Sequence, residues 1–196
     1  MTTLVIWGSA LAAYAVFWSW YVGFRPKVTP AEVERTMQLL DQRGSLTERQ
    51  KEHLRHFLAN DDGKDFVMVN LIDLKHPRRE SRDNLARYQK IFLGRLLRKA
   101  GHPVLTAIAS AGNVENVACE QADDWSAAGM IRYRSRRDLM EVLPDTVGSE
   151  HHALKLAAME KTFAFPASNW FMLGGPRVVA ALAIALIASL AQLAVA

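Results

Sequence analysis

The chain has 196 residues, among them 24 Lys and Arg and 20 Asp and Glu, which gives a net charge of +4. Residues 3–24 and 178–196 contain no acidic, basic or histidine side chain, so every charge lies between Arg25 and Arg177. This distribution excludes an entirely soluble protein and also a polytopic transporter with a large buried pore. The charged middle is long enough for one domain with its own core, but not comfortably for two.

The two uncharged segments are predicted to be transmembrane helices. About 20 apolar residues are needed to cross the hydrocarbon layer of a bilayer, and residues 3–24 and 178–196 are each of about that length. The first segment lacks the preceding basic residue of a cleaved signal peptide, and its apolar run is too long for one. The second is too uniformly apolar for a buried helix of a soluble core.

Basic and aromatic residues mark the same boundary of both segments, and no Lys or Arg lies beyond the other boundary. The positive-inside rule therefore predicts an inner-membrane protein with residues 25–177 in the cytoplasm and both termini outside. The single Cys119 fits a reducing compartment. Aromatic rings prefer the membrane–water interface, and the predicted interface residues are Trp18, Trp20, Tyr21, Arg25, Lys27, Trp170 and Arg177.

Two capping patterns predict a helical hairpin at residues 28–60. Thr29-Pro30-Ala31-Glu32 begins a helix that extends to about Gln42, and Ser45-Leu46-Thr47-Glu48 begins one that extends to about Ala59. A turn rich in Asn, Asp and Gly at residues 60–63 follows. The hairpin is expected to act as a packed spacer between the membrane and the main domain.

Residues 65–167 are predicted to form an α+β domain. In chain order, the expected elements are a strand at 66–72, a helix at 81–100, strands at 104–109 and 125–133, helical pieces at 135–143 and 149–159, and a strand at 162–166. Gly101 is expected to end the first of these helices, and Pro144 to interrupt the second. The order β-α-β-β-α-β predicts a ferredoxin-like fold.

Three segments of this domain, VMVNLIDL, RKAGHPVLTAIA and WSAAGMIRYRSRRDLMEVLPDTVGSEHHALKLAAMEKTFAF, carry a family resemblance. They resemble the dimeric α/β-barrel superfamily, and within it a group of small bacterial domains related to antibiotic-biosynthesis monooxygenases. The resemblance implies a homodimer that pairs two sheets face to face. The two apolar terminal segments lie outside the usual pattern of that superfamily.

The same resemblance implies a candidate site. In haem-degrading members of the superfamily, a His on the second helix ligates the iron, aided by an Asn on the first strand and a Trp on the second helix. His152 and Asn70 fall at the first two positions, whereas Val142 stands where the Trp would be, which argues against haem degradation. The residues alone leave a structural alternative, in which Asn70 bonds the backbone across the sheet and the adjacent histidines cap or solvate a helix.

If the domain is catalytic, its site is predicted between the sheet and the second helix. The expected catalytic residues are His152 and Asn70, and the expected ligand-binding residues are Tyr88, Trp125, Val142 and His151. No metal site is predicted, because His53 and His56 lack a third ligand nearby. No cofactor is predicted from the residues themselves. The resemblance makes haem a possible cofactor.

Three functions are compatible with this sequence. The favoured one is a membrane-anchored accessory or assembly subunit with a non-catalytic dimerisation domain, because the domain has few polar residues suited to catalysis. The alternative is a membrane-bound monooxygenase- or isomerase-like enzyme, or a haem- or small-lipophile-binding protein. The enzyme would be favoured if Asn70, Tyr88, Trp125 and His152 met in one apolar pocket. A small-ligand sensor would need such a pocket without acid–base groups. The expected partners are the lipid bilayer and either a second copy of the chain or a membrane-protein complex, and nucleic acid is discounted because no recognition motif is present.

Overall fold

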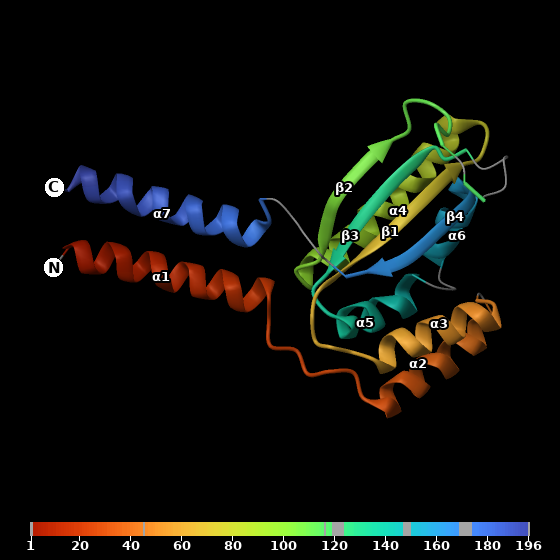
Figure 1. Ribbon diagram of the computed structural model, residues 1–196, viewed down its shortest axis with the longest axis horizontal. Helices are drawn as coiled ribbons and strands as arrows, with labels where there is room; N and C mark the ends of the chain where they lie inside the picture. Colours follow the sequence, from red (N-terminus) through yellow and green to blue (C-terminus); the bar gives the residue numbers. More distant parts are fainter. Residues whose placement is uncertain are drawn as a thin grey trace. The chain divides into compact units, whose positions relative to one another are not determined.

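A computed structural model of the protein describes residues 2–44, 46–115, 117–118, 124–146, 150–168 and 174–195, without the side chains of residues 145, 150 and 151. The predictions made above for Ser45, Cys119, His151 and Trp170 therefore lie outside the described residues or side chains. The chain forms two compact units (Figure 1), one from Met1–Phe24 with Asn169–Ala196 and the other from Arg25–Ser168.

The first unit consists of two apolar helices, α1 (Thr2–Tyr21) and α7 (Pro176–Ala194), that are long and apolar enough to cross a membrane. Helix α1 ends three residues before the predicted boundary, and Gly23 beyond it adopts a left-handed conformation with φ of 67°. The helices contact each other where α1 ends and α7 begins. The Tyr14 hydroxyl lies 3.4 Å from the Arg177 carbonyl oxygen, and the Arg177 guanidinium lies 5.8 Å from the centre of the Trp18 ring.

The predicted helical hairpin is present as α2 (Pro30–Arg43) and α3 (Glu48–Ala59). The first capping box forms as predicted, because the Thr29 side chain accepts from the backbone of Glu32 and the Glu32 carboxylate accepts from the backbone of Thr29. The second begins later than predicted. Its N-cap is Thr47, which pairs with Gln50 in the same reciprocal way.

The hairpin belongs to the same compact unit as the sheet, and its apolar side chains join those of a later helix. One cluster of buried residues contains Val28, Val33, Met37, Leu40 and Leu58 together with Met140 of α5 (Arg136–Thr146). An ion pair reinforces this contact, because Arg137 Nη1 of α5 lies 2.6 Å from the Glu32 carboxylate. The hairpin therefore forms part of the core instead of acting only as a spacer.

The second unit is built on a four-stranded antiparallel sheet, and its class is α+β as predicted. The strands are β1 (Phe66–Leu74), β2 (His102–Ile108), β3 (Ala127–Tyr133) and β4 (Met159–Ala167), in the spatial order β2-β3-β1-β4. The helices α4 (Arg78–Arg98), α5 and α6 (Glu150–Ala158) connect them. In Figure 1, α4 and α6 lie on the same side of the sheet.

The two faces of the sheet differ because successive side chains of a strand point to opposite sides. Met68, Asn70 and Ile72 of β1 face the side on which α4 and α6 lie. The opposite face carries exposed aromatic rings, since Phe163 is 57% and Phe165 43% exposed and the two rings pack edge to face.

Two predicted helix boundaries are wrong. Helix α4 ends at Arg98, and Ala100, not Gly101, adopts the left-handed conformation after it, with φ of 55°. Gly101 is needed for close packing instead. A Cβ atom there would lie 2.5 Å from Leu96 Cδ1 and 2.9 Å from the Arg132 carbonyl oxygen. Pro144 does not interrupt α5, because the helix ends soon after it, at Thr146, so that the bond lost at the proline is one near the helix end.

Candidate functional site

A cavity of about 1170 Å³ lies between the inner face of the sheet and helices α3 to α6. Pockets for drug-sized ligands typically measure about 300–1,000 Å³, so this space is large enough for such a ligand. Its lining combines sheet residues at alternate positions with apolar side chains from the covering helices. The cavity is therefore a consequence of how the sheet is covered, and no single loop creates it.

Gly129 opens the floor of the cavity. It lies opposite Asn70 of β1 and Thr106 of β2, and no atom lies within 4 Å of a Cβ built on it. Because Ala127, Ile131 and Tyr133 of the same strand also line the cavity, a side chain at position 129 would project into open space.

Helix α4 supplies one wall. Tyr88 is buried, and its ring stacks on Phe92 one turn later, with 5.7 Å between the ring centres. Burial raises the pKa of the Tyr88 phenol to about 12. The phenol is therefore protonated at neutral pH, so it acts as a hydrogen-bonding group and not as a base.

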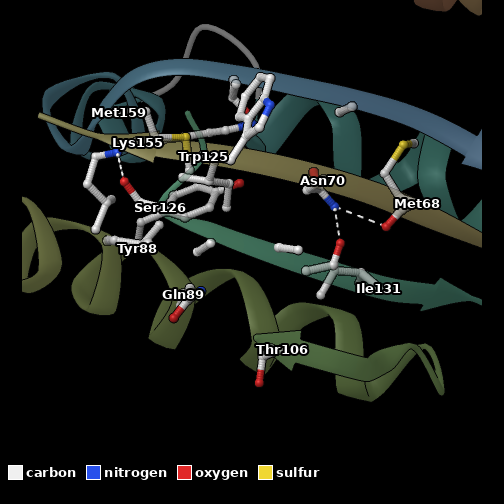
Figure 2. A pocket seen from close by; sticks show the side chains of 18 of the residues that line it. Met68, Asn70, Tyr88, Gln89, Thr106, Trp125, Ser126, Ile131, Lys155 and Met159 are labelled. Carbon is white, nitrogen blue, oxygen red and sulfur yellow. Dashed lines mark hydrogen bonds between the residues drawn. The ribbon is translucent and has the colours of Figure 1, made fainter. Parts of the chain in front are cut away.

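Four of the predicted site residues line this one cavity, namely Asn70, Tyr88, Trp125 and His152. Figure 2 shows Tyr88 and Trp125 toward one end and Asn70 nearer the middle of the view. They come from β1, α4, the segment before β3, and α6, so only the folded chain brings them together.

Val142 is a correction to the predicted site. It is 2% exposed and buried in the core, and the cavity is lined instead by Leu139, Leu143 and Thr146 of the same helix. These three residues lie on one stripe at helical spacing, and Val142 lies to one side of that stripe. The predicted wall of the site therefore comes from neighbouring positions of α5.

Asn70 also differs from the role that the resemblance implies. Its amide nitrogen donates to the Met68 carbonyl at 3.0 Å and to the Gly129 carbonyl at 3.4 Å. This is the backbone bonding across the sheet that the structural alternative predicted. The amide oxygen is then the atom of Asn70 that can meet a ligand, and it can only accept a hydrogen bond.

His152 and Lys155 line the cavity together, one turn apart on α6. Burial lowers the pKa of the His152 imidazole, and the charge of Lys155 lowers it further. Burial also lowers the pKa of Lys155. The imidazole is therefore mainly neutral at pH 7, and one of its ring nitrogens can accept a proton or a hydrogen bond.

Ser126 connects the cavity to a charged group behind it. The Arg78 guanidinium donates to the Ser126 hydroxyl at 2.8 Å, and that hydroxyl donates to the Asp73 carboxylate. The backbone nitrogen of Leu74 also donates to the Ser126 hydroxyl, at 3.1 Å. These bonds fix the start of α4 against the end of β1.

Gly129, Ser126 and Lys155 were not predicted from the sequence. The spacing of Lys155 three residues after His152 was the one available signal, since residues so spaced share a helix face. Gly129 and Ser126 carry no comparable signal, because their importance depends on which residues the neighbouring strands place opposite them.

The residues present do not fit an oxidative haem site. The Asn70 amide hydrogens are used by the backbone, and Val142, at the expected Trp position, does not reach the cavity. Among the described residues, no group of three or more His, Cys, Asp or Glu side chains is arranged to hold a metal ion.

Arg25, predicted at the membrane interface, has a structural role in the second unit. Its Nη2 atom lies 2.8 Å from both carboxylate oxygens of Glu141 and 3.2 Å from the buried carboxylate of Asp138. Arg137 similarly donates to the backbone carbonyl of Lys27 at 2.8 Å. The segment after α1 is thereby fastened to α5.

No family model and no curated protein matches this chain. Among solved structures it is similar to the RPA0582 protein of unknown function from Rhodopseudomonas palustris, with 19% identity and a TM-score of 0.49 over 65% of this chain and 96% of that chain. The methylated RPA0582 protein gives the same identity and TM-score, over 66% of this chain and 95% of that chain. Likeness at this level carries no argument about function.

Proposed function

We propose that the domain Arg25–Ser168 binds a small lipophilic ligand in the cavity between its sheet and its helices. The observation that carries this proposal is that Asn70, Tyr88, Trp125 and His152 line one large cavity among apolar side chains. Their meeting in one pocket was the condition that would favour the membrane-bound enzyme over a purely structural role, and such a pocket also suits a lipophilic ligand.

Binding without turnover is what the polar groups favour. The Tyr88 phenol stays protonated at neutral pH, because burial raises its pKa to about 12, and it therefore cannot act as a base. The Asn70 amide is held by backbone carbonyls. These groups can orient a ligand and recognise its polar atoms, and His152 is the one neutral base among the four predicted residues.

We infer that α1 and α7 anchor this domain in the inner membrane, with the domain in the cytoplasm and both chain ends outside. The contact of Arg177 with the Trp18 ring supports a common boundary for the two helices, because it places a basic and an aromatic residue together at the end of one and the start of the other. Such residues are typical of the cytoplasmic membrane interface.

We further infer that the domain is ferredoxin-like and belongs to the dimeric α/β-barrel superfamily. The strand order β2-β3-β1-β4 and the sequence of elements β1, α4, β2, β3, α5 with α6, and β4 support this assignment. Neither terminal helix takes part in the sheet.

Photolabelling of the full chain in detergent micelles tests the binding proposal. The probe is a neutral long-chain alkane with a diazirine group, and labelled peptides are identified by mass spectrometry. Labelling of α1 and α7 serves as an internal measure of probe in the micelle. We expect additional labelling of peptides from β1, β3 and α4 that line the cavity.

Gly129→Leu and Gly94→Leu are a matched pair for this test. Both glycines have open space around a built Cβ atom, but Gly129 lines the cavity and Gly94 lies exposed on α4. We expect Gly129→Leu to reduce cavity labelling strongly, and Gly94→Leu to leave it unchanged. Equal labelling in the two variants, or no labelling of the lining peptides in the wild type, would refute the proposal.

The exposed face of the sheet favours a second function, that of a dimerisation domain in an accessory subunit. In the register of β1 and β4, Leu71 lies opposite Phe163 and Val69 opposite Phe165, which makes an apolar stripe. Apolar surface of this kind marks contacts with other proteins. A Phe163→Cys variant in a Cys119→Ser background should form disulfide-linked dimers in micelles, whereas Ala157→Cys on the exposed side of α6 should not. Equal cross-linking by both would argue against this face.

A further inference from the structure

The polar groups at one end of the cavity are predominantly cationic. Lys155, Arg78 and Arg82 line the cavity as cations, and the Arg78 guanidinium reaches Ser126 there. His152 also lines it, with an imidazole that is mainly neutral at pH 7. Figure 2 places Lys155 and Ser126 at the same end, with Tyr88 and Trp125 beside them. A further positive charge lies over the ring of Trp125, because Lys161 Nζ is 5.0 Å from the centre of that ring.

The acidic groups at this end are already engaged. Asp73 lies behind the lining and accepts from the Ser126 hydroxyl. Asp124 lines the cavity but is exposed, and its carboxylate accepts from the backbone nitrogen of Asn113 at 3.2 Å. The net charge that a bound molecule meets at this end is therefore positive.

Lys155 is the cation whose environment most needs an anion. Its side chain is partly buried, and burial is the only cause that shifts its pKa downward. Within the described part of the chain, no hydrogen bond or ion pair to the Lys155 ammonium is formed. A charged amine removed from water without a partner is destabilised, and an anion at hydrogen-bond distance would offset that cost.

The rest of the cavity is apolar. Ile72 of β1, Leu85 and Phe92 of α4, and Met159 of β4 line it, and the open floor at Gly129 extends it along the sheet. A ligand that matches both regions has one anionic group and a hydrocarbon body.

We propose that the cavity takes a lipophilic anion, with a carboxylate or phosphate group paired to Lys155 and a hydrocarbon chain along the inner face of the sheet. This proposal rests on the proposed function and names the chemical class of its ligand. A domain held beside a bilayer by apolar helices has access to amphiphiles of this class.

Three photoactivatable probes of equal chain length test the charge preference on the full chain in micelles. They are a diazirine fatty acid, its methyl ester and the corresponding alkyl phosphate, each normalised to its labelling of α1 and α7. We expect both anions, or one of them, to label the cavity peptides about tenfold more than the ester, the preference that one charge-assisted hydrogen bond confers. The more strongly labelling anion identifies the head group.

Variants of Lys155 separate the two proposals. Lys155→Met should abolish the preference for the anion while ester labelling of the cavity persists, and Lys155→Arg should keep the preference. Lys90→Met, an exposed position of α4 away from the cavity, is the matched control and should behave as wild type. Ester labelling equal to that of the anions, or an anion preference that survives in Lys155→Met, would overturn the anion proposal and leave ligand binding standing. Absence of cavity labelling by all three probes would overturn ligand binding itself.

Discussion

Two glycines near the end of α4 should respond in opposite directions to the same substitution. Gly101→Ala adds a Cβ atom 2.5 Å from Leu96 Cδ1 and 2.9 Å from the carbonyl oxygen of Arg132. Leu96 is 0% exposed, and Arg132 pairs with His102 in the β2–β3 ladder, so neither can move without disturbing the core. Overpacking of this kind costs about 1–3 kcal/mol of unfolding free energy.

Gly94→Ala is the matched substitution on the exposed surface of the same helix. No atom lies within 4 Å of a Cβ built at Gly94, and its backbone is helical. Alanine loses less conformational entropy than glycine in a helix interior, so the variant should gain about 0.5–1 kcal/mol.

Urea unfolding of the full chain in micelles, followed by pulse proteolysis of the second unit, measures both effects. With a denaturant slope of about 1–3 kcal/mol per molar urea, the midpoints of the two variants should differ by about 0.5–4 M. A Gly101→Ala variant as stable as wild type would refute the close approach of α4 to β2 and β3. A Gly94→Ala variant less stable than wild type would show that this face of α4 is covered.

Three further outcomes are expected. A reporter that is active only in the cytoplasm should stay silent when fused after Ala196, and strong activity there would reverse the predicted topology. The pKa of Glu32 is lowered to about 2, chiefly by its bond from Arg137, so this carboxylate stabilises the fold above its unfolded pKa and loses that effect as the pH falls toward 2. The melting temperature of the wild type should therefore fall more steeply below pH 5 than that of Glu32→Gln. The corresponding difference in unfolding free energy should stay below about 1 kcal/mol, because the pair is partly exposed. Haem titration should give no saturable Soret band that depends on His152, and a band abolished by His152→Ala would instead establish haem ligation.

The elements that the sequence predicted well are those fixed by local chemistry. The capping box of Thr29 and Glu32 needs only four consecutive residues, and the apolar run that begins at Phe66 needs only the length of one strand. The end of α4 was predicted at the wrong residue because glycine is the usual left-handed terminator. Ala100 takes that conformation here, because Gly101 is required where β3 passes close by.

The candidate site was predictable only in part, for a related reason. Asn70 and His152 were identified by resemblance, and the structure places both in one cavity but gives the Asn70 amide to the backbone. The proposed ligand depends on the absence of a side chain at Gly129 and on the position of Lys155. Both depend on strand register and helix packing between segments far apart in the chain.

The two faces of the sheet suit two different kinds of contact, so the proposed ligand binding and the proposed self-association are compatible in this domain. The inner face combines a partly open, largely apolar cavity with polar groups at one end, and such a cavity suits a small molecule of matching shape and charge. The outer face presents the apolar stripe of Phe163 and Phe165, which the charged pair Asp73 and Lys161 borders at one end. An apolar surface of this kind gains most from another protein surface. A substitution such as Phe163→Glu should therefore weaken self-association without changing the labelling of the cavity, whereas Gly129→Leu should reduce that labelling and leave self-association unchanged. Loss of both properties in either variant would mean that the two faces do not act independently.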